Sequence, residues 1–495
     1  MQNIVEIFLQ AADEYPNRVA IVDQAQSISY AELKIQVKKT AAYFQQKGIQ
    51  KGDRILVFVP MSVDLYRIVL AIFYVGATAV FLDEWVNKKR LEICCQIADC
   101  KGFVGIWKAR VFALFSKELR RIPIKLSRKK QASKGISMQT IDTDDAALIT
   151  FTTGSTGTPK AARRTHEFLK AQFDALLEEI EPKASDIDMP VLPIVLFMNL
   201  GVGCTSVIAD FKMSKPEQMD ASKIVAQLSS NQVSRIIASP YFVKRLAQYV
   251  NEQQLELIHL QKIFMGGAPV FPAEAKQYLQ AFPNAITQIV YGSTEAEPIS
   301  SIGAKKLIVK EDQLSQGLPV GIPFHQAEVK IIQITSEDIV IEDQTIFEAL
   351  ILPEGEIGEI VVAGKHVLKQ YFNNEAAFRA NKIIVGKTIW HRTGDSGFFK
   401  GEALFLTGRC KQLIVAQNGY ISPFIIENEL QSLEEVSMGT LMKVGEELVL
   451  VIEGKITQNQ QFSFPFDRIQ HVTKIPRDPR HNSKINYGKL KALIS

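Results

Sequence analysis

Short runs rich in β-branched residues alternate with longer helical patterns through roughly the first 300 residues of the chain. The run RILVFV (54–59) is typical of a buried strand, and similar runs occupy 77–82, 234–239 and 286–292. Segments such as KIVAQLSS (223–230) separate these runs and place apolar residues at helical spacing. This alternation predicts an α/β fold with largely parallel sheets.

Two patterns near the N-terminus predict particular elements. Ser29 and Glu32 have the spacing of a capping box, which predicts a helix that begins there and ends near Gly48. The longest uncharged apolar run, 68–82, is shorter than the roughly 20 residues that a membrane-spanning helix needs. We interpret this run as a buried helix that continues into a buried strand.

The pattern changes near residue 310. From there to about residue 408, the runs AEVKII, EIVVAG and ALFLTG are separated by glycine and proline, which predicts a β-rich subdomain. A smaller α+β piece with the apolar runs ELVLVIEG and GKLKALIS closes the chain. Because 495 residues exceed what one hydrophobic core usually organises, we predict a large N-terminal domain, 1–408, and a small C-terminal domain, 409–495.

Charge and cysteine content narrow the classes of partner and location. The chain has 57 basic and 53 acidic side chains and no long block of one charge, which argues against nucleic acid as a partner. The five cysteines form no CxxC pair and have no histidine at metal-ligand spacing, which argues against zinc and for reduced thiols. The start MQNIVEIFLQAADE carries acids where a signal peptide carries bases. We therefore expect a cytoplasmic protein without a transmembrane segment.

A loop rich in hydroxyl groups and glycine follows the apolar run AALITF. In TTGSTGTPK (152–160), side-chain hydroxyls and backbone N–H groups would converge without bulky neighbours, an arrangement that holds phosphate oxygens. It is not a Walker A loop, because GK[ST] is missing and Pro159 precedes the lysine. The alternative is an ordinary surface turn. The hydroxyl and glycine residues, followed by Pro-Lys, come directly after a strand-like run, and this favours a phosphate loop over a surface turn.

Five ordered motifs together resemble one family. TTGSTGTPKAARRTH is similar to the phosphate loop of the acyl-adenylate-forming superfamily, which includes acyl-CoA synthetases, peptide-synthetase adenylation domains and luciferases. MGGAPVFP, YGSTEAEP, HRTGDSGFF and LTGRCKQLI follow in the family's order. The resemblance implies an N-terminal adenylation domain of two α/β sheets plus a β-rich subdomain, and a small mobile α+β lid. It also implies ATP and magnesium as cofactors and a carboxylic acid that is activated as an acyl-AMP with release of pyrophosphate.

The resemblance implies a role for each residue of the phosphate-binding motifs. The β- and γ-phosphates would be held by Thr153, Ser155, Thr156, Gly157 and Lys160. Glu295 would bind magnesium, because a hard carboxylate oxygen suits a hard cation that bridges phosphates. Thr294 would bond the α-phosphate, and both Thr294 and Glu295 would be catalytic.

The family pattern also implies how adenine and ribose would be held. The residues concerned are Gly267, Ala268, Pro269, Tyr291, Gly292, Asp395 and Arg409. The backbone of 267–269 and the Tyr291 ring would face adenine, Asp395 would accept bonds from the ribose hydroxyls, and Arg409 would support the sugar. Singly, Glu295 could cap a helix, Asp395 could serve a turn and Arg409 could be a surface charge. Because all the motifs occur together in the family's order, a nucleotide-binding site is favoured over these separate structural roles.

Two stretches depart from the family pattern. In GYISPFIIE, Pro423 lies one residue closer to Gly419 than usual and Ile425 replaces the first glutamate, whereas Glu427 keeps its place. This stretch helps to form the family's pantetheine tunnel, so the acceptor of the acyl group stays open. The segment 192–211 lacks the histidine of most acyl-CoA synthetases and resembles the β-lactone synthetases of bacterial olefin biosynthesis, usually labelled fatty-acid CoA ligases.

Three functions therefore remain open at this point. The one we expect is ATP-dependent activation of a hydrophobic, fatty or β-hydroxy fatty acid and transfer to CoA or a carrier-protein thiol, as in a fatty-acid CoA ligase; the other two are alternatives. The second is closure of a β-lactone, in which the substrate's own hydroxyl displaces AMP without CoA. The third is a nucleotide-binding pseudoenzyme or scaffold. The apolar segments 192–206 and 238–242 predict a hydrophobic acyl pocket.

The lid of this family carries a lysine that neutralises charge between the carboxylate and the α-phosphate. The stretch HNSKINYGKL offers two candidates. The general motif has glycine before the lysine, as in Gly488-Lys489, but the preceding Pro-Arg and the following isoleucine fit Lys484. The pattern favours Lys484 as catalytic and Lys489 as a solvated helix charge. Lys411 falls at the family's hinge, where the lid would turn.

Overall fold

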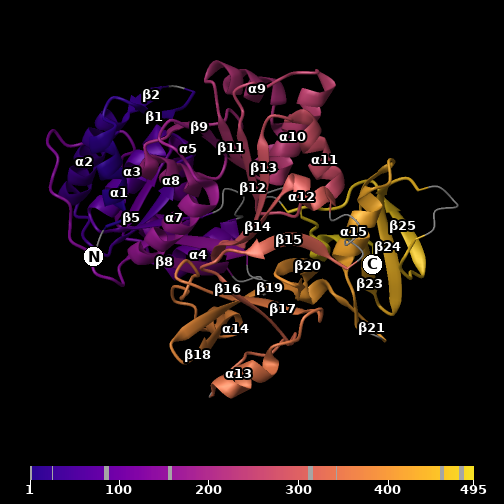
Figure 1. The fold of residues 1–495 in the computed structure, drawn as a ribbon. Helices are drawn as coiled ribbons and strands as arrows, with labels where there is room; N and C mark the ends of the chain where they lie inside the picture. Colours follow the sequence, from indigo (N-terminus) through magenta and orange to yellow (C-terminus); the bar gives the residue numbers. More distant parts are fainter. Residues whose placement is uncertain are drawn as a thin grey trace.

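The structure is a computed structural model that describes residues 3–24, 26–82, 88–153, 159–309, 316–341, 343–417, 419–456, 462–478 and 484–494. For Thr152 and Thr153 the description covers the backbone alone. In Figure 1 the N-terminal elements lie on one side of the molecule, the C-terminal elements on the opposite side, and the segment around residues 330–390 below them. No helix within the described ranges is both long and apolar enough to cross a bilayer.

A six-stranded sheet forms the core of the N-terminal part. Its elements are α2 (Tyr30–Gln46), β3 (Arg54–Phe58), α3 (Val63–Tyr74), β4 (Thr78–Phe81), α4 (Lys88–Ala98), β5 (Gly102–Gly105), α5 (Trp107–Leu114), α6 (Lys117–Arg121), β6 (Ile124–Leu126), β7 (Ala146–Thr153) and β8 (Pro159–Thr165). The strand order is β6-β5-β3-β4-β7-β8, and every neighbouring pair is parallel except β7 and β8. Mostly parallel pairing confirms the predicted α/β character.

The local predictions in this part are confirmed. Ser29 caps α2, and its side chain and that of Glu32 form the reciprocal bonds of a capping box. The helix ends at Gln46, and Gly48 adopts φ +88°, a left-handed conformation that glycine accepts at no steric cost. The run 68–82 forms the buried end of α3 and the buried strand β4.

A larger sheet runs through the middle of the molecule. Its first elements are α1 (Val5–Glu14), β1 (Val19–Val22), β2 (Ser27–Ser29), α7 (His166–Ile180), β9 (Ile187–Pro190), α8 (Pro193–Val202), β10 (Thr205–Val207), α9 (Ala221–Ser230), β11 (Arg235–Ala238), α10 (Pro240–Glu252), β12 (Lys262–Gly266), α11 (Pro272–Ala281), β13 (Ile286–Ser293), β14 (Ala296–Gly303) and α12 (Ala304–Val309). Strands β1, β10, β9, β11, β12 and β13 pair in parallel in this order. Figure 1 shows α9, α10 and α11 together at one end of these strands.

The predicted β-rich part continues the same sheet. It contains β15 (Leu318–Pro323), β16 (Glu328–Ile332), α13 (Gln344–Leu350), β17 (Gly358–Ala363), α14 (Glu375–Asn381), β18 (Lys382–Val385), β19 (Thr388–Lys400) and β20 (Ala403–Arg409). Because β13, β14, β15 and β20 pair antiparallel in succession, the parallel half and the β-rich half become one sheet of 14 described strands. Residues that are distant in sequence can therefore meet across neighbouring strands.

A small α+β unit follows β20, as the sequence indicated. Its elements are the 3-10 turn η3 (Cys410–Gln412), β21 (Ile414–Ala416), β22 (Gly419–Ile421), α15 (Pro423–Gln431), β23 (Val436–Val444), β24 (Glu447–Gly454), β25 (Arg468–Val472) and α16 (Tyr487–Ile494). Strands β23, β24 and β25 form a separate sheet with its own buried residues. The Ser422 hydroxyl donates to the Thr407 carbonyl at 2.8 Å and links this unit to β20.

Candidate active site

A cavity of about 2410 Å³ lies between the large sheet, the six-stranded sheet and the C-terminal unit. Residues that follow β11, β12 and β13 line it. These strands are parallel neighbours, so the segments after them emerge at the same edge of the sheet, where α/β proteins bind ligands. The cavity therefore occupies the expected place for a site in this fold.

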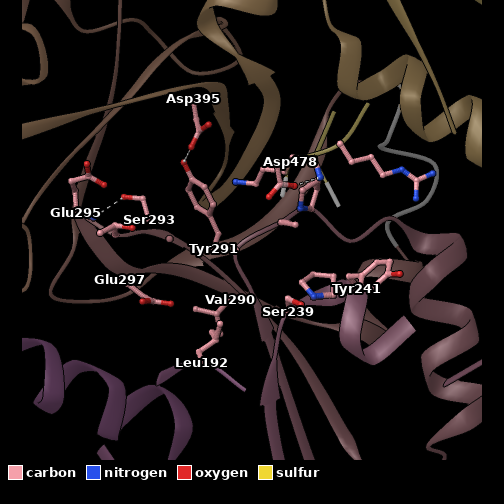
Figure 2. Close-up of a pocket in the computed structure, with 18 of the residues that line it drawn as sticks. Leu192, Ser239, Tyr241, Val290, Tyr291, Ser293, Glu295, Glu297, Asp395 and Asp478 are labelled. Carbon is pink, nitrogen blue, oxygen red and sulfur yellow. Dashed lines mark hydrogen bonds between the residues drawn. The ribbon is translucent and has the colours of Figure 1, made fainter. Parts of the chain in front are cut away.

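One wall of the cavity is built from Tyr291, Asp395 and Arg409. Strand pairing sets Asp395 opposite Arg409, and the Arg409 Nε lies 3.0 Å from Asp395 Oδ1. The Tyr291 hydroxyl donates to Asp395 Oδ2 at 2.9 Å, and Figure 2 shows the phenol pointing toward this carboxylate. Burial raises the pKa of Tyr291 well above its usual value, which keeps the hydroxyl a donor. The wall presents a carboxylate held between two donors.

Glycines let backbone approach the cavity at two places. Gly267 follows β12 with φ +90°, in the left-handed region that favours glycine. A Cβ on Gly292 would lie 2.9 Å from the Ala296 carbonyl oxygen, so a larger residue would force the β13–β14 turn apart. Gly267, Ala268, Pro269 and Gly292 all line the cavity. The structure thus brings the two predicted adenine-facing motifs to the same space.

A second wall contains Glu295, which is 9 % exposed. The Tyr371 hydroxyl donates to Glu295 Oε1 at 3.2 Å, and the backbone carbonyl of Thr294 accepts a bond from Arg164 at 3.0 Å. Lys160 donates to Asn381 Oδ1 at 2.6 Å. Burial lowers the pKa of Lys160, and the Glu295 charge opposes that change. This wall combines one carboxylate with several cationic or donor groups.

Sequence reasoning missed Tyr371, Asn381 and Lys382 near this wall. Lys382 is 2 % exposed, donates to the Leu368 carbonyl and lies 5.7 Å from the centre of the Tyr371 ring. Burial lowers the pKa of Lys382 to about 7, and the nearby Glu295 carboxylate acts in the opposite sense. The one available signal was a lysine at the start of the strand-like run KIIV.

The C-terminal unit brings Lys484 to the cavity and leaves Lys489 away from it. Lys484 is among the lining residues, and its backbone N–H donates to Asp478 Oδ1 at 2.8 Å. Lys489 lies exposed on α16, where its backbone N–H bonds the Asn486 side chain. Lys411 lines the cavity from η3. The preference for Lys484 stays a prediction, and its position agrees with it.

The described residues include the two ends of the predicted phosphate loop. Ser155, Thr156 and Gly157 lie outside the described residues. Thr153 is the last residue of β7, with its backbone opposite Pro159 of β8. Lys160, next along β8, lines the cavity.

The donor set fits a nucleoside triphosphate with magnesium. Magnesium is usually held by one or two carboxylates together with phosphate oxygens; Glu295 offers such a carboxylate, and the nearby Lys160 offers a cation to the phosphates. The Asp395 carboxylate and the Arg409 guanidinium offer an acceptor and a donor to a sugar diol. Magnesium at this wall would neutralise charge on the phosphates during transfer.

Apolar side chains also line the cavity, and we call this part of the lining the apolar arm. Both segments that the sequence singled out contribute to it, through Leu192, Ile194 and Phe197 and through Tyr241 and Phe242. Figure 2 shows Leu192 beside Val290, and the two residues belong to one apolar cluster. The six-stranded sheet adds further apolar side chains, including Phe58, Phe81 and Leu82. The lining suits a hydrophobic substrate tail.

Comparisons with known proteins place the chain in a family. A model of the AMP-binding enzyme family matches residues 8–372. An olefin β-lactone synthetase of Xanthomonas campestris pv. campestris is 29 % identical, with 94 % of this chain and 90 % of the relative covered. A feruloyl-CoA synthase of an Amycolatopsis species is 25 % identical, with 84 % and 80 % covered. These matches confirm the resemblance that the motifs indicated.

A solved structure shows the same fold at low identity. The amide bond synthetase of Marinactinospora thermotolerans superposes with a TM-score of 0.82 at 19 % identity, and 99 % of this chain and 100 % of the other are covered. The family model spans most of the chain and includes the β7–β8 loop, β12, β13 and Glu295. The chain belongs to the AMP-binding enzyme family, whose members are acyl-adenylate-forming ligases that use ATP with magnesium.

Proposed function

We propose that this chain adenylates a hydrophobic β-hydroxy acid and closes it to a β-lactone. The observation that carries the proposal is its similarity to an olefin β-lactone synthetase over 94 % of the chain. A second β-lactone synthetase, from Stenotrophomonas maltophilia, is 27 % identical over the same share. The apolar arm and the departure from the pantetheine motif at Ile425 support the same conclusion.

Each predicted site residue has a task in this reaction. Asp395 and Arg409 hold the ribose, the 267–269 backbone and Tyr291 face adenine, and Lys160 with the β7–β8 loop binds the outer phosphates. Glu295 holds magnesium and Thr294 bonds the α-phosphate. Lys484 neutralises the charge that develops as a substrate carboxylate oxygen bonds the α-phosphorus and pyrophosphate leaves.

The second step needs no external acceptor in this proposal. The β-hydroxyl oxygen of the substrate bonds the acyl carbon, the mixed-anhydride bond between that carbon and the phosphate oxygen breaks, and AMP leaves. The hydroxyl proton passes to water or to the leaving phosphate. Both steps occur in one cavity, and because the ring contains only C1 to C3 and the β-oxygen, the rest of the acyl chain can stay against the apolar lining.

We also propose how the chain is divided and where it acts. Residues 1–408 form the adenylation domain and 409–495 a lid that carries Lys484 and turns near Lys411. The separate β23-β24-β25 sheet supports this division. The five cysteines are free thiols, four of them buried, which agrees with a cytoplasmic location.

A second candidate function is transfer of the acyl group to CoA or to a carrier-protein thiol. The similarity to a feruloyl-CoA synthase over 84 % of the chain favours it. It shares the first half-reaction with the lactone proposal and differs in the acceptor. The nucleotide-binding pseudoenzyme is the third alternative.

One experiment separates these functions. The enzyme is incubated with ATP, magnesium and β-hydroxy acids of graded length, with and without CoA, beside matched acids that lack the hydroxyl. Pyrophosphate release and lactone in the complete absence of thiol support the proposal. An acyl-CoA product without lactone supports the second candidate, and bound ATP without pyrophosphate release over the whole panel supports the pseudoenzyme.

A further inference from the structure

Helix α5 carries an apolar stripe on the outside of the molecule. Trp107, Val111 and Leu114 recur at intervals of four and three residues, so they lie on one face of the helix, and Phe115 follows as its C-cap. These four side chains are 69 %, 46 %, 65 % and 70 % exposed. A helix of a globular protein normally turns such a face toward the core. This face points to solvent instead.

Basic side chains lie on the helix that carries the stripe and on the helix that follows it. The segment 107–121 contains five basic residues and one acidic residue, Glu118. The five are exposed, on α5 and on the neighbouring α6, and are Lys108, Arg110, Lys117, Arg120 and Arg121. Lys108 Nζ lies 5.6 Å from the centre of the Trp107 ring. Tryptophan, phenylalanine and leucine flanked by lysine and arginine are the composition of helices that lie in a membrane interface.

The same helix borders the apolar arm of the cavity. Lys108 and Ala109 of α5 line it together with Phe58, Phe81 and Leu82. The exposed stripe and the cavity lining are therefore presented by one short helix. A hydrophobic acid that leaves a bilayer beside this helix would enter the apolar arm with little exposure to water.

We propose that the α5 surface, defined as Trp107, Val111, Leu114, Phe115 and the five basic residues of α5 and α6, binds a lipid bilayer with anionic headgroups. The apolar stripe would enter the interface and the basic side chains would contact the headgroups. The proposal goes beyond lactone synthesis and needs no particular acyl acceptor. The bilayer is favoured over a protein partner because exposed aromatics and a one-sided basic charge occur together.

Vesicle sedimentation tests the proposal without ATP or acid, so its outcome is independent of the chemistry of the active site. The full chain is mixed with vesicles of phosphatidylcholine alone or with phosphatidylglycerol added. We expect binding to the anionic vesicles that weakens as salt rises. The triple variant Trp107→Ser, Leu114→Ser, Phe115→Ser should lower the partition coefficient at least tenfold. The double variant Lys117→Gln, Arg120→Gln should remove the preference for anionic lipid.

Two controls keep the result interpretable. Ile258 and Val340 are 68 % and 76 % exposed and lie elsewhere, so Ile258→Ser with Val340→Ser should bind vesicles like the parent chain. The thermal midpoint of the triple variant, and its pyrophosphate release with an acid supplied in solution, should match those of the parent chain. An acid supplied in anionic vesicles should instead be used several-fold more slowly by the triple variant.

Three results would overturn the proposal. The parent chain does not bind anionic vesicles, or the triple variant binds them as well as the parent. Alternatively, sedimentation without lipid shows a parent dimer and a monomeric triple variant while neither binds vesicles, in which case a second copy of the chain covers the stripe.

Discussion

The Tyr371 hydroxyl touches the carboxylate to which we assign magnesium. It donates to Glu295 Oε1 at 3.2 Å, and burial raises the pKa of this phenol, which keeps it a donor. A positioned carboxylate binds a metal ion better than one that rotates freely. We therefore expect Tyr371 to position the Glu295 carboxylate and to take no part in the chemistry itself.

Tyr371→Phe should weaken magnesium binding without abolishing the reaction. Loss of one hydrogen bond to a charged group costs about 1.5 kcal/mol, so the magnesium concentration for half-maximal pyrophosphate release should rise about tenfold. Tyr278→Phe removes another buried hydroxyl, which contacts the Pro240 carbonyl at 3.4 Å, and should leave the magnesium curve unchanged. Equal shifts in both variants would point to a general loss of structure.

Lys484→Ala should lower the rate of pyrophosphate release by two or more orders of magnitude, because the charge at the α-phosphate is no longer neutralised. ATP binding should survive, since the other proposed nucleotide contacts come from the large sheet and from Lys160 of the six-stranded sheet. Lys489→Ala is the matched control and should have little effect, because Lys489 does not line the cavity. If Lys489→Ala were the inactive variant, the preceding glycine would mark the catalytic lysine.

The candidate site residues could be singled out from the sequence because each lies in a local pattern of glycine, hydroxyl and charged residues. Glu295, Asp395 and Arg409 all line the cavity in the structure. The residues that hydrogen-bond to them could not be identified from the sequence. Lys160 meets Asn381 at the end of α14, and Glu295 meets Tyr371 where isolated bridges join Val367 to β14 and Tyr371 to β8. A single sequence does not contain that register.

At the scale of elements, a hydrogen bond of His166 connects the start of helix α1 with the start of helix α7. His166 begins α7, is fully buried, and its Nδ1 accepts the Ile4 N–H at 3.2 Å. Burial lowers the pKa of His166 to about 4, with Asp145 opposing the change and Lys51 adding to it. A neutral imidazole is needed here, because a protonated Nδ1 could not accept the bond.

The free energy of unfolding should therefore fall as the pH drops from about 6.5 to 4. In that window the unfolded chain binds a proton at this histidine and the folded chain does not, which costs up to about 1.4 kcal/mol per pH unit. Chemical denaturation of His166→Gln at several pH values should show a shallower slope. His259→Gln changes an exposed histidine and should keep the slope of the parent chain.

Elements were predicted well where a local signal exists, as with the Ser29 cap of α2 and the strand β3. The continuity of the large sheet was not predicted. It depends on β14 and β15 pairing with Ser301 opposite Ile322, and nothing local in either strand specifies this partner. Non-local pairing is set by the whole core.

At the scale of the whole molecule, the nucleotide wall draws on β13, β19 and β20. A ligand bound there ties together parts of the chain that are more than 100 residues apart. Magnesium-ATP at about 100 times its dissociation constant should raise the free energy of unfolding by about 2.7 kcal/mol. The thermal midpoint with and without nucleotide measures this.

Three variants test which side chains the nucleotide-dependent shift in the thermal midpoint depends on. Asp395→Asn should lose most of the nucleotide-dependent shift, whereas Lys484→Ala should keep it. Asp13→Asn removes an exposed carboxylate on α1 and should keep it too. A full shift in Asp395→Asn would remove this carboxylate from the ribose contacts.

The strand order of the large sheet also has a consequence for synthesis. Strand β1 pairs in parallel with β10, with Ile21 opposite Ser206. At roughly 5–20 residues per second, a ribosome needs about ten to forty seconds to make the chain between these two strands. The β1–β2 hairpin can form at once, but the other edge of β1 stays unpaired until β10 has been made. The free edge of β1 is therefore exposed in the nascent chain until β10 has been made, and an exposed strand edge can pair with other chains.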